Sequence, residues 1–170
     1  MPEFFGPLHN IINNALSFDL DRAFFSLFSQ PEFKEMVLLL NRKKQLFKER
    51  VNSLGVKLSD VGGGYAAYTE DVNAGVTFTY EGESMTKQEG DSPNLYDSGE
   101  FYESFEVTVG IGFFQITADP IKDDGTNLFD EWGEDILGLT QESKTLLVEF
   151  LTPALQKLYV QAVTTGRIAA

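Results

Sequence analysis

Residues 105–118 read FEVTVGIGFFQITA, and this stretch decides the fold class of the chain. Phe105, Val107 and Val109 alternate with polar residues, and the run that follows the Gly-Ile-Gly segment alternates in the same way. Such alternation is typical of a strand that is buried on one face. Two alternating runs joined by a glycine-containing turn predict an antiparallel hairpin near 103–118.

The end of the chain predicts a long amphipathic helix at about 140–163. Thr140 is suited to cap its N-terminus, and apolar side chains recur at helical spacing after it, although Pro153 interrupts the backbone hydrogen bonds. Apolar spacing also predicts N-terminal helices within residues 1–30. We therefore expect an α+β fold: a small antiparallel sheet packed on the C-terminal helix, with the N-terminal helices beside it, in a single domain of residues 1–170.

The middle of the chain is less regular. Residues 35–40 (EMVLLL) have the length of a buried strand or of a helical turn, and we expect a short strand followed by a helical turn at 43–48. Residues 76–80 alternate and predict a strand. Residues 81–97 are polar and acidic and contain glycine, which predicts a mobile acidic loop.

Composition indicates a folded protein that also has apolar side chains outside its own core. The 170 residues are 42% hydrophobic and include 15 Phe, so we expect a core and some rings that a neighbouring subunit covers. There is no cysteine, which excludes disulfides, thiolate nucleophiles and Cys-ligated zinc. The chain lacks a basic start followed by an apolar run, and it lacks a long apolar stretch. We therefore expect a soluble protein with no membrane partner.

Charge is unevenly distributed along the chain. The net charge of −13 opposes binding of nucleic acid through the general surface, because phosphate contacts need Lys and Arg. Residues 1–50 carry 7 basic and 6 acidic side chains, whereas residues 51–170 carry 6 and 20. The basic residues gather in one segment, which is either a solvated face or a subunit interface that meets an acidic neighbouring copy. The candidate interface residues are Arg42, Lys43, Lys44, Lys48 and Arg50.

No catalytic constellation emerges from the sequence, and we predict no catalytic residue, metal or cofactor. His9 is the single histidine, and nothing in its context supplies the partners of a catalytic dyad. Residues 62–64 are three glycines without the Lys-Ser or Lys-Thr that a phosphate-binding loop requires. Residues 123–135 are rich in carboxylates, but a calcium loop with Gly125 at its sixth position would place Pro120 first.

Three segments carry a resemblance to a known family. Residues 45–55 (QLFKERVNSLG), followed by Tyr65 and Thr69, residues 94–105 (NLYDSGEFYESF) and residues 136–140 (ILGLT) occur in this order. They resemble segments of the virion-morphogenesis, tail-completion and neck proteins of tailed bacteriophages. The chain departs from that pattern at residues 49–51, where a glycine is common, and at Ser98, where threonine is common.

The family motif implies a structural role for thirteen of its residues in this chain. These residues are Gln45, Leu46, Phe47, Gly55, Tyr65, Leu95, Asp97, Ser98, Gly99, Phe101, Ser104, Gly138 and Leu139.

The resemblance implies a structural, non-catalytic subunit of a homo-oligomeric ring at the portal–tail junction of the virion, made in the cytoplasm of a bacterial host. Portal or adaptor proteins and tail proteins would be its partners. DNA would pass through the ring without specific binding, since an acidic lumen repels phosphates. The candidate lumen or ring-contact residues are Glu81, Glu83, Glu89, Asp91 and Asp97.

Other functions stay open at this point. A tail-terminator or collar-ring subunit of the same particle would differ in position and ring size. An acidic adaptor or nucleic-acid mimic would also fit the high negative charge. A metal-dependent hydrolase acting through the carboxylates of residues 123–135 is the enzymatic alternative, although no nucleophile–base pair supports it.

Overall fold

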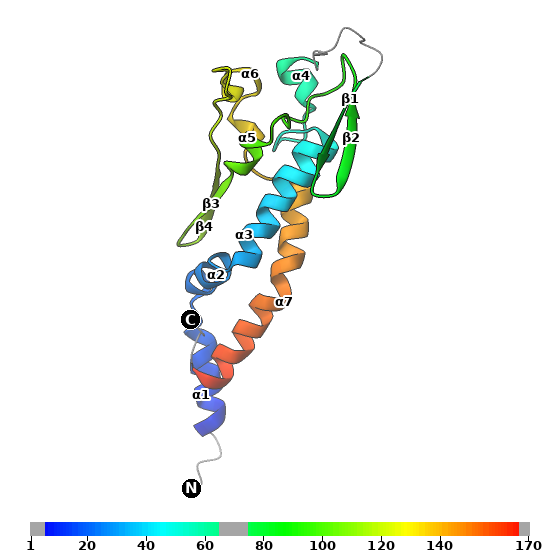
Figure 1. Ribbon diagram of the computed structural model, residues 1–170. Coiled ribbons are helices and arrows are strands. Elements are labelled where there is room, and N and C mark those ends of the chain that lie inside the picture. Colours follow the sequence, from blue (N-terminus) through cyan, green and yellow to red (C-terminus); the bar gives the residue numbers. More distant parts are fainter. Residues whose placement is uncertain (1–5, 65–74, 167–170) are drawn as a thin grey trace.

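The computed structural model describes residues 6–64 and 75–166, and it opens with the expected N-terminal helices (Figure 1). Helix α1 spans Gly6–Leu16 and α2 spans Leu20–Phe28. The side chain of Asp19 begins α2, because its Oδ1 accepts the backbone N–H of Arg22 at 2.9 Å. The prediction of helices within residues 1–30 is confirmed.

A longer helical segment follows where a strand was expected. Helix α3 (Pro31–Leu38) continues directly into η1 (Leu39–Glu49), whose wider turns are π-helical. The prediction of a strand at residues 35–40 is therefore wrong. Phe33, Val37 and Leu40 are buried at helical spacing, so one face of this helix enters the core.

Two separate antiparallel hairpins follow. Strands β3 (Glu106–Gly110) and β4 (Phe113–Thr117) pair with Val107 opposite Ile116, and both of these side chains are buried. This confirms the hairpin near 103–118. Strand β1 (Val76–Tyr80) pairs with β2 (Glu83–Lys87), so the prediction of a loop over residues 81–97 is wrong for β2.

The polar composition of β2 explains this error. Ser84 and Thr86 are exposed on its outer face, where their hydroxyls hydrogen-bond to Thr79 and Thr77 of β1. The turn between the strands consists of Glu81 and Gly82, both with positive φ (47° and 79°), as a type I′ hairpin turn requires.

Short helices lead into the long C-terminal one. They are α4 (Leu58–Gly62), α5 (Glu100–Glu103), α6 (Leu128–Trp132) and η2 (Glu134–Ile136). Helix α7 (Gln141–Thr165) then runs through Pro153, and Thr140 caps it by accepting the N–H of Ser143 at 3.1 Å. The helix expected at about 140–163 is confirmed, and so is the α+β class.

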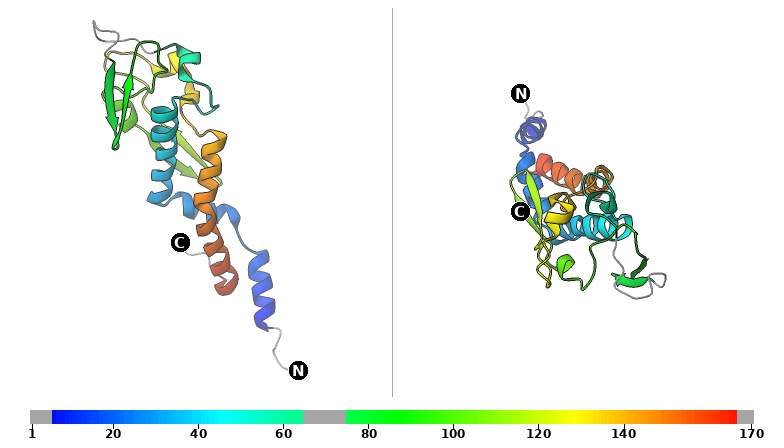
Figure 2. Two further views of the ribbon diagram at one scale, coloured as in Figure 1. Left: turned by 90° about the vertical axis from the view of Figure 1, so that its right-hand side faces the viewer. Right: turned by 90° about the horizontal axis from the view of Figure 1, so that it is seen from above.

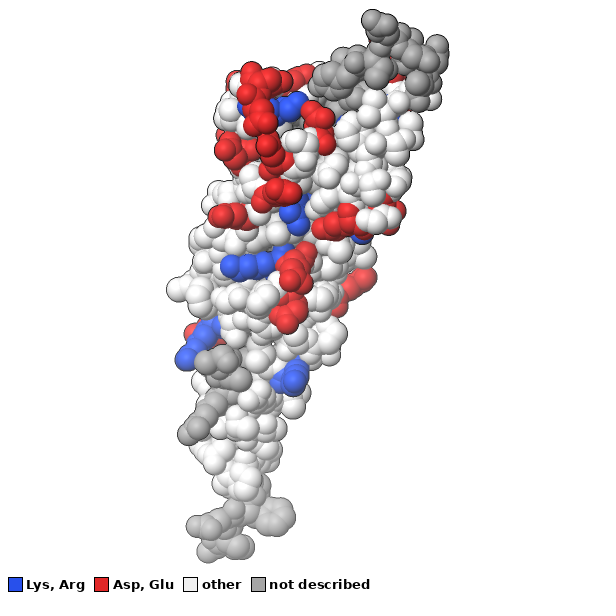
Figure 3. All heavy atoms as spheres, viewed as in Figure 1, with Lys and Arg blue, Asp and Glu red and all other residues white. Residues whose placement is uncertain are grey.

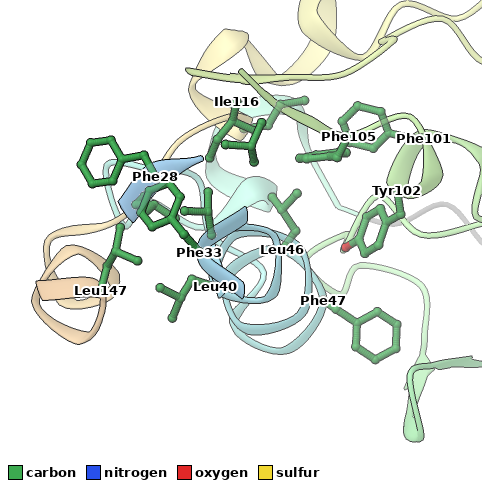
Figure 4. Close-up of a cluster of buried hydrophobic side chains, with 14 of the residues drawn as sticks. Phe28, Phe33, Leu40, Leu46, Phe47, Phe101, Tyr102, Phe105, Ile116 and Leu147 are labelled. Carbon is green, nitrogen blue, oxygen red and sulfur yellow. The ribbon is translucent and has the colours of Figure 1, made fainter. Parts of the chain in front are cut away.

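The core lies around α3 and η1 (Figure 4). Phe33, Leu40 and Leu46 lie between Leu147 of α7 and the apolar side chains of the β3–β4 hairpin and α5. The hairpin packs mainly on α2 and α3, and α3 in turn contacts α7. The small sheet is thus joined to the C-terminal helix through α3.

One end of the molecule is a narrow arm. Helix α1 packs against the end of α7, and in Figure 2 these two helices extend away from the rest of the chain. The first and last described residues, Gly6 and Gly166, belong to these two helix ends. We use the name arm for α1 together with residues 158–166 of α7. None of the helices described for residues 6–64 and 75–166 has the length and apolar character that crossing a bilayer requires.

Candidate functional site

The three segments that carry the family resemblance meet at η1. Gln45 Nε2 donates to the backbone carbonyl of Gly138 at 3.0 Å, and Gln45 Oε1 accepts the N–H of Thr140 at 2.9 Å. Asn41 Nδ2 donates to the carbonyls of Ile136 and Gly138, at 3.2 and 2.6 Å. Both amide side chains are completely buried, and these bonds satisfy both polar atoms of Gln45 and the amide nitrogen of Asn41, whereas Asn41 Oδ1 has no hydrogen-bond partner among the described residues.

The second segment is fixed to the same helix. Arg42 Nη1 donates to the carbonyl oxygen of Tyr102 at 2.7 Å, and the Tyr102 hydroxyl donates to the carbonyl oxygen of Asn94 at 2.5 Å. Complete burial raises the pKa of the Tyr102 hydroxyl well above its usual value, which keeps the hydroxyl a donor. Phe47 packs edge-on against Tyr96, so the segment is also joined to η1 through ring contacts.

The remaining residues of the second segment shape α5. Gly99 precedes this helix with φ at 100°, and Ser98 Oγ accepts the N–H of Glu100 at 3.4 Å. Phe101 is buried, while Ser104 Oγ donates to the Phe101 carbonyl and accepts the N–H of Asp119.

Other motif residues serve packing or turns. Leu46, Phe47 and Leu139 are buried in the core. Gly55 and Gly138 have positive φ (77° and 114°), a conformation that favours glycine.

Two further motif residues complete this picture. Leu95 also has a positive φ (57°), which is uncommon for a branched side chain. Tyr65 lies outside the described residues. The described motif residues therefore build the fold around η1, and they form no reactive constellation.

The candidate interface cations already have partners within the subunit. Arg42 and Lys43 lie 4.0 and 3.9 Å from the carboxylate of Glu81, and Lys48 lies 2.8 Å from that of Glu83. These pairs join η1 to the β1–β2 hairpin, and we call them the charged seam. The same residues were expected to meet carboxylates of a neighbouring copy, and that contact stays a prediction. Within the subunit, the carboxylates of Glu81 and Glu83 already compensate much of their positive charge.

The other two basic residues are paired as well. Lys44 lies 3.0 Å from Glu142 at the start of α7 and also pairs with Glu49; burial lowers its pKa, but the bonds to both carboxylates outweigh this and raise it. Arg50 lies 3.5 Å from Asp91.

Most of the carboxylates that are candidates for a ring lumen are consequently engaged in ion pairs and do not form one unpaired acidic loop. Glu81, Glu83 and Asp91 belong to the pairs described above, and Asp97 lies 3.4 Å from Lys122. The hydrogen bond from Lys48 lowers the pKa of Glu83, which keeps that carboxylate ionised. Glu89 is exposed. Acidic side chains nevertheless gather on the face in Figure 3 at the end of the molecule that carries α5 and α6.

A buried lysine is the main polar feature that the sequence did not reveal. Lys87 Nζ donates to Asn94 Oδ1 at 2.9 Å and to the Tyr96 carbonyl at 2.8 Å, and it lies 3.8 Å from the centre of the Phe78 ring. Lys87 is 3% exposed, and burial lowers its pKa to about 8. The alternation of β2 could have placed it on the inner face, had the strand been recognised.

Lys87 borders a shallow cleft of about 220 Å³ whose walls include Tyr96, Asp97, Lys122 and Trp132. A second cleft of about 230 Å³ shares Asp97 and Lys122 with the first. The ammonium group of Lys87 is held by two protein acceptors, so its geometry is that of a structural cation.

The carboxylates of residues 123–135 are not gathered into a metal-binding group. Hydrogen bonding to Asp123 raises the pKa of Glu100, so these two carboxyls contact each other at the protein surface. Within the described parts of the chain, no three His, Asp or Glu side chains converge closely enough to hold a metal ion. His9 lies on α1 and is exposed.

Comparison with known proteins adds no assignment. No family model, curated protein or solved structure matches the chain.

Proposed function

We propose that this chain is a structural, non-catalytic subunit of a tailed-bacteriophage virion, forming a ring at the head–tail junction as a neck or tail-completion protein. The observation that carries the proposal is the convergence of the three resembling segments on η1. Segments up to 97 residues apart meet there through hydrogen bonds of Asn41, Gln45 and Arg42. A shared packing unit explains why such segments would occur together and in order.

The charge distribution supports a passage that does not hold DNA. The net charge is −13, and the basic cluster of η1 is engaged with carboxylates of the same subunit. The densest group of cations is therefore already engaged within the subunit, and binding of duplex DNA depends on cations that neutralise phosphates. A passage that does not bind DNA would suit tail-terminator and collar-ring subunits equally well, so experiment must decide which ring the chain forms.

The test is to locate the chain in a particle. Antibodies against the full-length chain should label the head–tail junction of tailed virions whose genome encodes it, and negative-stain images of the purified chain should contain closed rings. Duplex DNA should not shift in a gel with the purified chain even at low salt. Labelling elsewhere in the particle, or complete absence of the chain from virions, would contradict the proposal.

A further inference from the structure

The arm carries an apolar face that its own subunit does not cover. In α1, Asn14 Nδ2 donates to the Val163 carbonyl at 3.0 Å, and Phe18 just beyond the helix packs edge-on against Tyr159. These contacts fix which side of α1 faces α7. Leu8, Ile12 and Leu16 recur every four residues on a different side of the helix and are 53%, 48% and 82% exposed.

Helix α1 receives only partial packing from its own subunit, where it contacts α7. It contains 11 residues, none of them buried, and helices of this length are marginal in water without packing. An apolar stripe with a spacing of four residues is the pattern that helices use to pack on other helices.

The size of the uncovered surface suits a contact between proteins. The exposed apolar side chains of the arm are Leu8, Ile11, Ile12, Leu16, Tyr159 and Val160. At about 150–250 Å² for a fully exposed large side chain, they offer on the order of 600 Å². This lies at the upper end of patches on monomeric proteins, and together with the polar residues between them it approaches the roughly 800 Å² that each partner contributes to a stable interface.

Charge indicates that the partner is a second copy of this chain. Residues 6–18 and 158–166 contain no Asp, Glu, Lys or Arg, although the whole chain carries −13. On the face in Figure 3, charged atoms are scattered over the rest of the molecule, whereas the end formed by α1 shows none. Two copies that meet through their arms therefore avoid the repulsion that contacts between their acidic ends would cause. A helix that binds a membrane surface usually carries Lys and Arg on its polar face, and α1 has neither.

We infer that the arm is a contact surface between copies of this chain, in which the Leu8–Ile12–Leu16 stripe of one copy packs against the uncharged arm of the next. This deepens the proposed function, on which it rests for the closed ring, by naming a surface through which copies associate.

The test compares the mass of the full-length chain with that of two arm variants, Ile12→Glu and Leu16→Glu, by light scattering at micromolar concentrations. A carboxylate in this contact should weaken self-association by about tenfold or more. Leu54→Glu is the matched control, because Leu54 is 69% exposed just before α4, and α4 lies at the opposite end of the molecule from α1 (Figure 1). The control should associate like the unsubstituted chain, and all four proteins should unfold at similar temperatures.

Other outcomes separate this inference from the proposed function. Rings that persist in both arm variants would overturn the arm contact and leave the ring intact. A chain that is monomeric alone but labelled at the head–tail junction of virions would overturn the arm contact and keep the virion role. Binding of the arm to neutral phosphatidylcholine vesicles without self-association would also overturn it. Loss of self-association with Ile12→Glu, in a chain that virions lack, would support the contact and contradict the virion role.

Discussion

Gln45 holds the residue that caps the last helix: its side-chain carbonyl accepts the N–H of Thr140 at 2.9 Å, while its amide donates to the Gly138 carbonyl at 3.0 Å. Gln45 lies on η1 and is completely buried, and Thr140 caps α7. One side chain thus fixes where the C-terminal helix begins relative to the central one.

Gln45→Leu should destabilise the fold. The substitution leaves the N–H of Thr140 buried without its acceptor, so the free energy of unfolding should fall by about 1–3 kcal/mol in urea titrations. Gln156→Leu is the matched control, because Gln156 is exposed on α7 and its loss should change stability by about 0.5 kcal/mol or less. Equal stability of the two variants would show that the bonds of Gln45 contribute little.

Arg42→Lys should also be destabilising although it keeps the charge. The guanidinium donates to the Tyr102 carbonyl, approaches Glu81 and lies 6.0 Å from the centre of the Tyr80 ring. An ammonium group cannot make these contacts at once, so we expect a loss of about 1–2 kcal/mol by thermal or chemical unfolding. Arg22→Lys, at an exposed position of α2, should be nearly neutral. A neutral Arg42→Lys would argue against the geometry of this contact.

Lys87 makes the free energy of unfolding depend on pH in the alkaline range. Its pKa of about 8 in the folded chain is below the usual 10.5, so between these values the unfolded chain binds more protons and stability rises with pH. Between these two pH values the free energy of unfolding should rise by at most about 3 kcal/mol. Measurements should stop near pH 10, because burial raises the pKa of Tyr80 to about 12 and stability falls as the tyrosine of the unfolded chain ionises.

Lys87→Met should remove this rise. Urea titrations of both proteins between about pH 7.5 and 10 should give a stability difference that grows with pH in favour of the unsubstituted chain. A difference that is constant over this range would mean that Lys87 keeps an ordinary pKa in the fold.

The charged seam should respond to salt. Lys43→Glu combined with Lys48→Glu replaces two partners of Glu81 and Glu83 with like charges, so the melting temperature should fall at low ionic strength. At about 1 M salt the Debye length is about 3 Å, and most of this difference should disappear. Lys157→Glu changes charge at an exposed position of α7 and should have little effect at either salt concentration. A loss of rings by the double variant at unchanged melting temperature would instead favour a seam between copies.

The sequence predicted those elements whose signals are local. Thr140 as a cap and the Val107–Ile116 alternation depend on neighbours in the chain, and the structure confirms both elements. Residues 35–40 were assigned wrongly because the five consecutive apolar residues after Glu35 carry no period that distinguishes strand from helix. The strand β2 was missed because its outer face is polar and its inner face includes a lysine.

The site was less predictable than the fold. The sequence identified a basic and an acidic segment as separate surfaces, but it could not show that Lys48 and Glu83 are each other's partners. Pairing of this kind depends on how a hairpin folds back on a helix, which is a tertiary property. The exposed stripe of α1 was likewise readable as an amphipathic helix, while its lack of cover within the subunit required the structure.

The bonds of Asn41 and Gln45 also set an order for events during synthesis. Their acceptors and donors lie 93–97 residues further along the chain, so the ribosome must deliver residue 140 before the central helix can satisfy its buried amides. Contacts of such sequence separation slow folding, and chains that wait for them expose apolar surface. A nascent chain truncated before Gly138 should therefore depend on chaperones, whereas the complete chain closes its own core.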